Sequence, residues 1–103
     1  MNIHRARRKK VRGVDIPPEE IEFLNNPEGG IILKWNTETS HARIKHSGIS
    51  EELSPEDKEK IRRKNNHKLN GGRITIFENE GYSPESNKSQ ALSRLKAILQ
   101  KSL

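Results

Sequence analysis

Two consecutive glycines, Gly29 and Gly30, lie between two short apolar stretches and constrain the fold more than any other feature of the sequence. Glycine reaches positive φ at no steric cost, so the pair predicts a tight turn. Residues 20–24 alternate between acidic and apolar side chains, and residues 31–35 are mostly apolar. The sequence therefore predicts a hairpin of two strands. Its only tryptophan, Trp35, is expected to anchor the core, with a base-stacking platform as the alternative.

The residues after the hairpin predict one more strand and a helix. Residues 41–46 alternate between polar and apolar side chains, which is typical of a half-buried strand. Ser54 and Pro55 are followed by two acids, and a capping serine, a first-turn proline and acids at the positive end of the helix dipole together predict a helix start. We expect this helix to continue to about Lys68 and to end at Asn70–Gly72, where glycine can adopt the left-handed cap.

The C-terminal third predicts a further strand and a second helix. Residues 73–77 are rich in β-branched side chains, which favour a strand. Ser83–Glu85 repeats the serine, proline and acid sequence of a helix start. Apolar residues follow at helical spacing; they are Ala91, Leu92, Leu95, Ile98 and Leu99. The expected fold is therefore α+β, a small mixed sheet of three to four strands with two packed helices in the order β-β-(β)-α-β-α.

The composition excludes several classes of site. At 103 residues and 29% hydrophobic content, the chain fits one domain with a small core. Cysteine is absent, which removes disulfides, thiolate chemistry and cysteine-based zinc sites. The four histidines lack the spacing of a metal site, and no apolar run suits a membrane span or a secretory signal. We expect a monomer with no cofactor, no metal and no membrane partner.

The positive charge is concentrated at the N-terminus. Residues 1–13 contain six cations and no acid; these are Arg5, Arg7, Arg8, Lys9, Lys10 and Arg12. The chain holds 20 cations and 14 acids, so this segment accounts for the whole net charge of +6. Such a block is typical of a disordered tail that binds phosphate, so we expect residues 1–13 to bind nucleic acid and residues 14–103 to form the domain. A solubilising tail, a targeting sequence and a membrane-surface anchor are the alternatives.

A second group of cations lies toward the end of the first expected helix. Arg62, Arg63 and Lys64 could contact phosphate there. Basic residues near a helix C-terminus are also favoured by the helix dipole alone. Both interpretations remain open from the sequence.

Several short motifs occur in the order found in class I peptide chain release factors. Together they cover roughly residues 14–103, and the chain resembles the catalytic domain of this family, especially the ribosome-rescue peptidyl-tRNA hydrolases. The motifs are Ile16-Pro17 before Glu20-Ile21-Glu22, then Gly29-Gly30, then Asn36 before Ala42-Arg43-Ile44, then Tyr82-Ser83 with Asn87-Lys88, and finally Ala91-Leu92-Ser93-Arg94-Leu95. The resemblance implies the same α+β fold and a ribosomal partner: rRNA, the mRNA channel or peptidyl-tRNA.

The resemblance breaks at the catalytic motif. The family's Gly-Gly-Gln positions a water for ester hydrolysis, whereas Gly29 and Gly30 are followed here by Ile31. We therefore expect a cytoplasmic, ribosome-associated RNA-binding protein without hydrolytic activity, an organelle being the alternative location. One alternative function is a peptidyl-tRNA hydrolase that orients water with the backbone amides of Gly29 and Gly30. Another is a protein–protein adaptor with a passive tail.

Overall fold

The glycine pair forms the turn of an antiparallel hairpin, as the sequence predicts. The computed structural model describes residues 11–67 and 69–103. In it β2 (Glu22–Asn25) pairs with β3 (Ile31–Asn36) across that turn. β7 (Arg73–Glu78) pairs with the other side of β3, and the short β6 (Leu69–Asn70) pairs with β7. The result is a four-stranded sheet in the order β2-β3-β7-β6.

Three other strands form a second sheet, which the sequence does not predict. β1 (Gly13–Asp15), β4 (Arg43–His46) and β5 (Ile49–Glu52) pair in the order β1-β4-β5. β4 lies within the strand predicted over residues 41–46, and Ile44 on it is buried. Both sheets are antiparallel throughout the described residues, where the sequence predicted one mixed sheet.

The two predicted helices are present, and serine caps both. In α2 (Pro55–Lys64), Ser54 and Asp57 form a reciprocal capping box. In α3 (Pro84–Ser102), the Ser83 side chain accepts a hydrogen bond from the backbone N–H of Ser86. With two helices and small antiparallel sheets, the predicted α+β fold class is confirmed.

α2 ends earlier than predicted. Asn65 leaves the helical conformation, and both its backbone N–H and its side-chain amide donate to the carbonyl of Ile61. Gly71 and Gly72, which the sequence assigned to the helix cap, instead form the turn between β6 and β7. Their φ angles are 63° and 85°, and two positive angles in succession are what a two-residue hairpin turn requires.

The start of β2 also differs from the prediction. Residues 18–20 form a single turn of 3-10 helix, η1 (Pro18–Glu20), so the strand begins at Glu22 rather than at residue 20. Proline at the first position favours such a turn because its φ is already fixed near the helical value. This small change places the Glu20 side chain beside β3, where it becomes the centre of a polar network.

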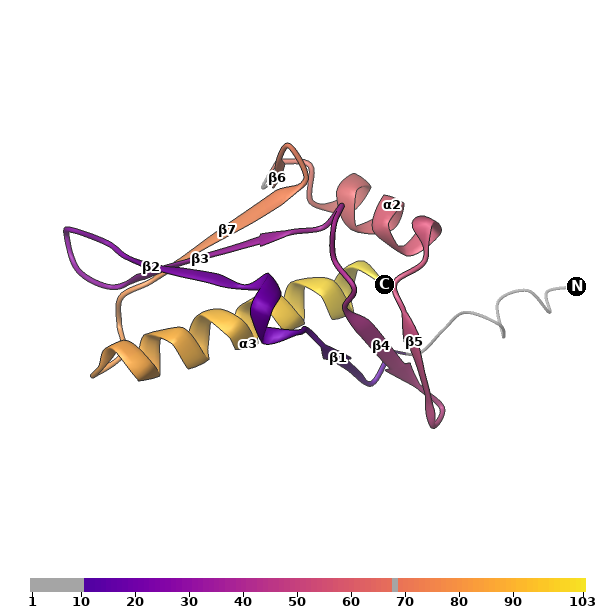
Figure 1. Ribbon diagram of the computed structural model, residues 1–103, viewed down its shortest axis with the longest axis horizontal. Helices are drawn as coiled ribbons and strands as arrows, with labels where there is room; N and C mark the ends of the chain where they lie inside the picture. Colours follow the sequence, from indigo (N-terminus) through magenta and orange to yellow (C-terminus); the bar gives the residue numbers. More distant parts are fainter. Residues whose placement is uncertain (1–10, 68) are drawn as a thin grey trace, which may run out of the picture.

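One hydrophobic cluster joins the sheets and helices. Figure 1 shows α3 running along the four-stranded sheet, with the β2–β3 turn near its N-terminal end and α2 and the β4–β5 hairpin toward its C-terminal end. Trp35 is 1% exposed within this cluster, in agreement with its predicted role as a core anchor. The other fully buried apolar residues include Leu33, Ile44, Ile61, Ile74, Leu95 and Leu99.

Candidate nucleic-acid interface

The Gly29–Gly30 turn is closed by its own hydrogen bonds. The backbone N–H of Gly29 donates to the carbonyl of Asn26 at 2.8 Å, and the N–H of Asn26 donates to the carbonyl of Gly30 at 3.1 Å. The side chain of Asn26 also accepts from the N–H of Glu28 at 3.2 Å. The amide of Gly29, which the hydrolase alternative would use, is therefore engaged within the turn.

Gly30 has a packing role that explains the absence of a side chain. Its φ is 93°, a region that favours glycine. A Cβ at this position would lie 2.6 Å from the carbonyl oxygen of Glu78 and 2.6 Å from the Cβ of Asn79. The glycine thus allows the beginning of β3 to pass close to the end of β7. The next residue, Ile31, is 2% exposed and belongs to the core rather than to a projecting tip.

A pocket of about 400 Å³ lies beside this turn and the start of α3. Asparagine side chains dominate its lining, together with the fully exposed ring of Tyr82. No carboxylate or imidazole is among its lining residues. General acid–base catalysis of ester hydrolysis usually needs such a group within hydrogen-bonding reach of the reacting atoms. The pocket therefore offers polar contacts but no acid–base pair.

The structure separates the three predicted cations of α2. Arg62 binds the carboxylate of Glu38 through two contacts of 2.6 and 2.7 Å, and that of Glu59 at 2.6 Å. The hydrogen bond with Glu59 contributes most to raising the pKa of Arg62, and the same pair lowers the pKa of Glu59. Arg63 and Lys64 are exposed, and their side chains make no hydrogen bond or ion pair within residues 11–67 and 69–103. Of these three cations, only Arg63 and Lys64 make no direct contact with a carboxylate of the described residues.

The predicted basic tail is only partly described. Arg12 is exposed, and its backbone N–H donates to the carbonyl of Lys45 at 2.7 Å, which extends the pairing of β1 with β4. The other five predicted cations, Arg5, Arg7, Arg8, Lys9 and Lys10, lie outside the described residues. Their role therefore rests on the sequence.

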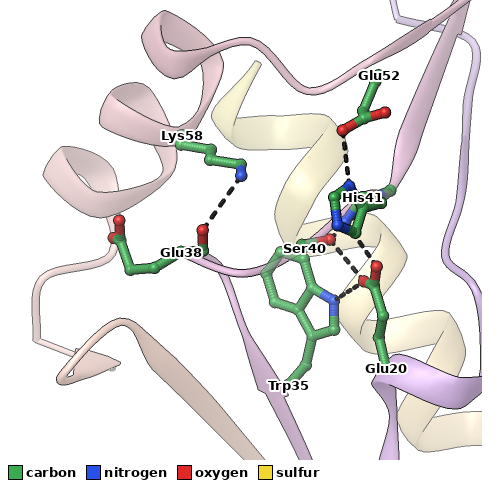
Figure 2. A network of polar contacts seen from close by, with 8 residues as sticks. Glu20, Trp35, Glu38, Ser40, His41, Glu52 and Lys58 are labelled. Atoms are coloured by element: carbon green, nitrogen blue, oxygen red, sulfur yellow. Dashed lines mark hydrogen bonds and ion pairs between the residues drawn. The ribbon is translucent and has the colours of Figure 1, made fainter.

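A polar network around Glu20 is the main feature that the sequence did not reveal (Figure 2). The Glu20 carboxylate accepts from the Trp35 indole at 3.2 Å, from the Ser40 hydroxyl at 2.6 Å and from the backbone N–H of His41 at 2.6 Å. Ser40 is 1% exposed and its oxygen also accepts from the N–H of Ala42. A buried hydroxyl that is engaged in this way stabilises the fold and is not accessible as a nucleophile.

His41 extends the network to the second sheet. Its Nδ1 lies 2.8 Å from a carboxylate oxygen of Glu52 on β5. This hydrogen bond lowers the pKa of Glu52. The contacts of Glu20 and His41 join η1, β3 and β5. No local sequence pattern predicts that these elements lie next to one another.

The part of the chain that the structure describes contains neither a metal-binding cluster nor a membrane-spanning helix. No group of three or more His, Cys, Asp or Glu side chains within the described residues could hold a metal ion. Neither described helix combines the length and the apolar character that crossing a membrane requires.

The comparisons with known proteins do not assign the chain to a family. The resemblance to release factors consequently remains a prediction that rests on the order of short sequence motifs. Family models, curated proteins and solved structures were all searched, and none matches the chain.

Proposed function

We propose that the protein binds RNA on the ribosome, in the cytoplasm, as a non-hydrolytic relative of release and rescue factors. The observation that carries this proposal is the separation of charge: residues 1–13 hold six cations and no acid, and account for the whole net charge of +6. Binding of such a segment to RNA releases condensed counterions, which supplies affinity that does not depend on the base sequence. Ribosomal RNA is the polyanion that the resemblance implies.

The hairpin turn supports binding without hydrolysis. Ile31, which follows the glycine pair in place of a glutamine, is buried in the core. The N–H of Gly29 donates within the turn. The adjoining pocket contributes no carboxylate or imidazole. Neither the residue after the glycine pair nor an acid–base group in the pocket is therefore available to activate water at an ester.

A single-turnover release assay separates the candidate functions. Purified protein is added to ribosomes stalled with labelled peptidyl-tRNA, and sedimentation measures binding alongside peptide release. We expect binding without release. Release that disappears in a folded Gly29→Ala variant would instead support a peptidyl-tRNA hydrolase. If the protein neither binds ribosomes nor releases peptide, and a protein partner co-purifies with it after nuclease treatment, the results would support an adaptor.

The salt dependence of RNA binding tests the role of the tail. Each phosphate contact on single-stranded RNA changes the slope of log affinity against log salt concentration by about −0.7, so six contacts give about −4. Replacing Arg7, Arg8 and Lys9 with alanine should reduce the slope to about −2. A variant with the same change in net charge, K34A/R73A/K96A, is the control. Equal slopes for wild type and tail variant would refute binding through the tail.

A further inference from the structure

A groove of about 460 Å³ lies between the C-terminal end of α2 and the C-terminal half of α3. Four basic side chains line it, and none of its lining residues is acidic. They are Lys64, His67, Arg94 and Lys101. The neighbouring Arg62 differs, since it meets the carboxylates of Glu38 and Glu59. Residues 14–103 hold 14 cations and 14 acids, so the groove is a local concentration of positive charge on a domain without net formal charge.

The helix dipole explains only part of this concentration. Lys64 and Lys101 lie in the last turns of α2 and α3, where a cation is favoured without any ligand. Arg94 lies in the middle of α3, beyond the reach of this end effect. The structure moreover brings the two helix ends together, so cations from separate helices face one groove. Mutual repulsion of like charges makes such convergence unfavourable, and an anion bound in the groove would relieve it.

The basic side chains differ in how firmly they are held. Nη1 of Arg94 donates to the carbonyl of Phe77 at 3.1 Å and to the carboxylate of Glu78 at 3.0 Å. Its Nε and Nη2 make no hydrogen bond to any residue that the structure describes, so the guanidinium is oriented and still has donors to offer. The side chains of Lys64, His67 and Lys101 make no hydrogen bond or ion pair within residues 11–67 and 69–103.

The floor of the groove is rigid because two buried polar side chains connect the helices. The amide of Asn65 donates to the hydroxyl of Ser102 at 2.8 Å and to the carbonyl of Ile61 at 2.8 Å. The Ser102 hydroxyl donates in turn to the carbonyl of Ile98 at 2.7 Å. Asn65 and Ser102 are 6% and 3% exposed. This connection fixes the spacing of Lys64 and Lys101, so binding need not order the backbone that carries them.

We propose that this groove binds backbone phosphates of RNA, as a second contact on the RNA that the N-terminal segment holds. The proposal rests on the proposed function and specifies a site for it within the folded domain. Arg94 supplies a planar donor that suits phosphate oxygens, and Lys64 and Lys101 supply point charges on either side. Contacts of this kind position a nucleic acid and do not read its sequence.

The test compares two variants of the full-length chain that lose equal charge. K64A/K101A removes the two lysines of the groove, and K34A/K96A removes two lysines outside it. Lys34 lies on β3 and Lys96 on α3, and neither lines the groove. The probe is a single-stranded oligouridylate, with binding measured by fluorescence anisotropy over a range of salt concentrations. Circular dichroism confirms that each variant is folded.

Counterion release predicts the size of the effect. At about 0.1 M monovalent salt each lost contact to single-stranded RNA weakens binding about fivefold, and two contacts about 25-fold. We expect this loss for K64A/K101A, with a salt slope reduced by about 1.4, and a much smaller change for K34A/K96A. K64R/K101R, which keeps both charges, should retain the affinity of the wild type.

Three outcomes would overturn the proposal in distinguishable ways. If both alanine variants weaken equally, the effect is one of net charge and the groove is not a site. If K64A/K101A binds as tightly as the wild type while the tail variant R7A/R8A/K9A does not, RNA is held by the N-terminal segment alone and the proposed function stands. If the wild type binds neither the oligouridylate nor ribosomes, the proposed function itself fails.

Discussion

Replacing Glu20 with alanine should destabilise the fold strongly, although Glu20 lies in a surface turn and contributes no apolar surface. Its carboxylate accepts three hydrogen bonds, and two of the donors, the Trp35 indole and the Ser40 hydroxyl, belong to residues that are each 1% exposed. A buried donor left without a partner costs about 1–3 kcal/mol. The third donor, the N–H of His41, belongs to an exposed residue and can bond to water instead.

The expected loss is about 3 kcal/mol, because Glu20 is half-buried and water can reach part of the vacated site. A loss of this size should lower Tm by about 15 °C in a domain of roughly 100 residues. Urea denaturation and calorimetry of Glu20→Ala would measure both quantities. Glu19→Ala is the control, since its exposed side chain makes no hydrogen bond in the described chain and should change stability by at most about 0.5 kcal/mol. If Glu20→Ala costs less than about 1 kcal/mol, the network does not stabilise the fold.

Two further predictions concern the glycine turn and acid titration. Gly30→Ala should lower the free energy of unfolding by about 3 kcal/mol and Gly29→Ala by only about 1 kcal/mol. Both glycines have positive φ, but only at Gly30 would a Cβ lie against Asn79. Equal losses in urea denaturation would contradict this packing role. His41→Ala should raise the pKa of Glu52 toward its ordinary value of 4.5, because the hydrogen bond from His41 lowers it in the folded protein. The corresponding stabilisation is present above the unfolded pKa and is lost as pH falls through the folded pKa. An NMR titration of the Glu52 carboxyl in both proteins measures the shift, and identical pKa values would show that the hydrogen bond has no effect.

The parts of the fold that were predicted correctly have strong local signals. Ser83 followed by proline and glutamate predicted the start of α3, and the apolar spacing after it predicted the face that α3 buries. The paired glycines at 29 and 30 predicted the hairpin. In each case the residues that determine the element lie within a few positions of it, so a reading along the chain contains the necessary information.

The parts that were missed depend on partners far along the chain or lack a pattern. All four residues of β5 are exposed, so no alternation of apolar and polar side chains marks it as a strand. β1 is three residues long and becomes a strand only by pairing with β4. Gly71 and Gly72 suit a helix cap and a hairpin turn equally well, and the choice depends on β6 finding β7. Local propensity cannot decide such cases.

The candidate sites divide in the same way. The basic segment at residues 1–13 is visible in the sequence because it is contiguous. The Glu20 network and the groove are assembled from separate elements, and of the groove's basic residues only Lys64 was among the predicted contacts. Arg62 has the same charge and lies two positions earlier, but it binds Glu38 and Glu59 instead. Only the folded structure shows that Arg62 is paired with carboxylates whereas Lys64 lines the groove.

The connection between Asn65 and Ser102 has a consequence for the order of folding during synthesis. The two residues are 37 positions apart, so α2 is complete well before the residue that secures its end has been made. At typical elongation rates this interval lasts about 2 to 7 s. The apolar face of α2 around Ile61, fully buried in the finished protein, is incompletely covered until α3 has emerged.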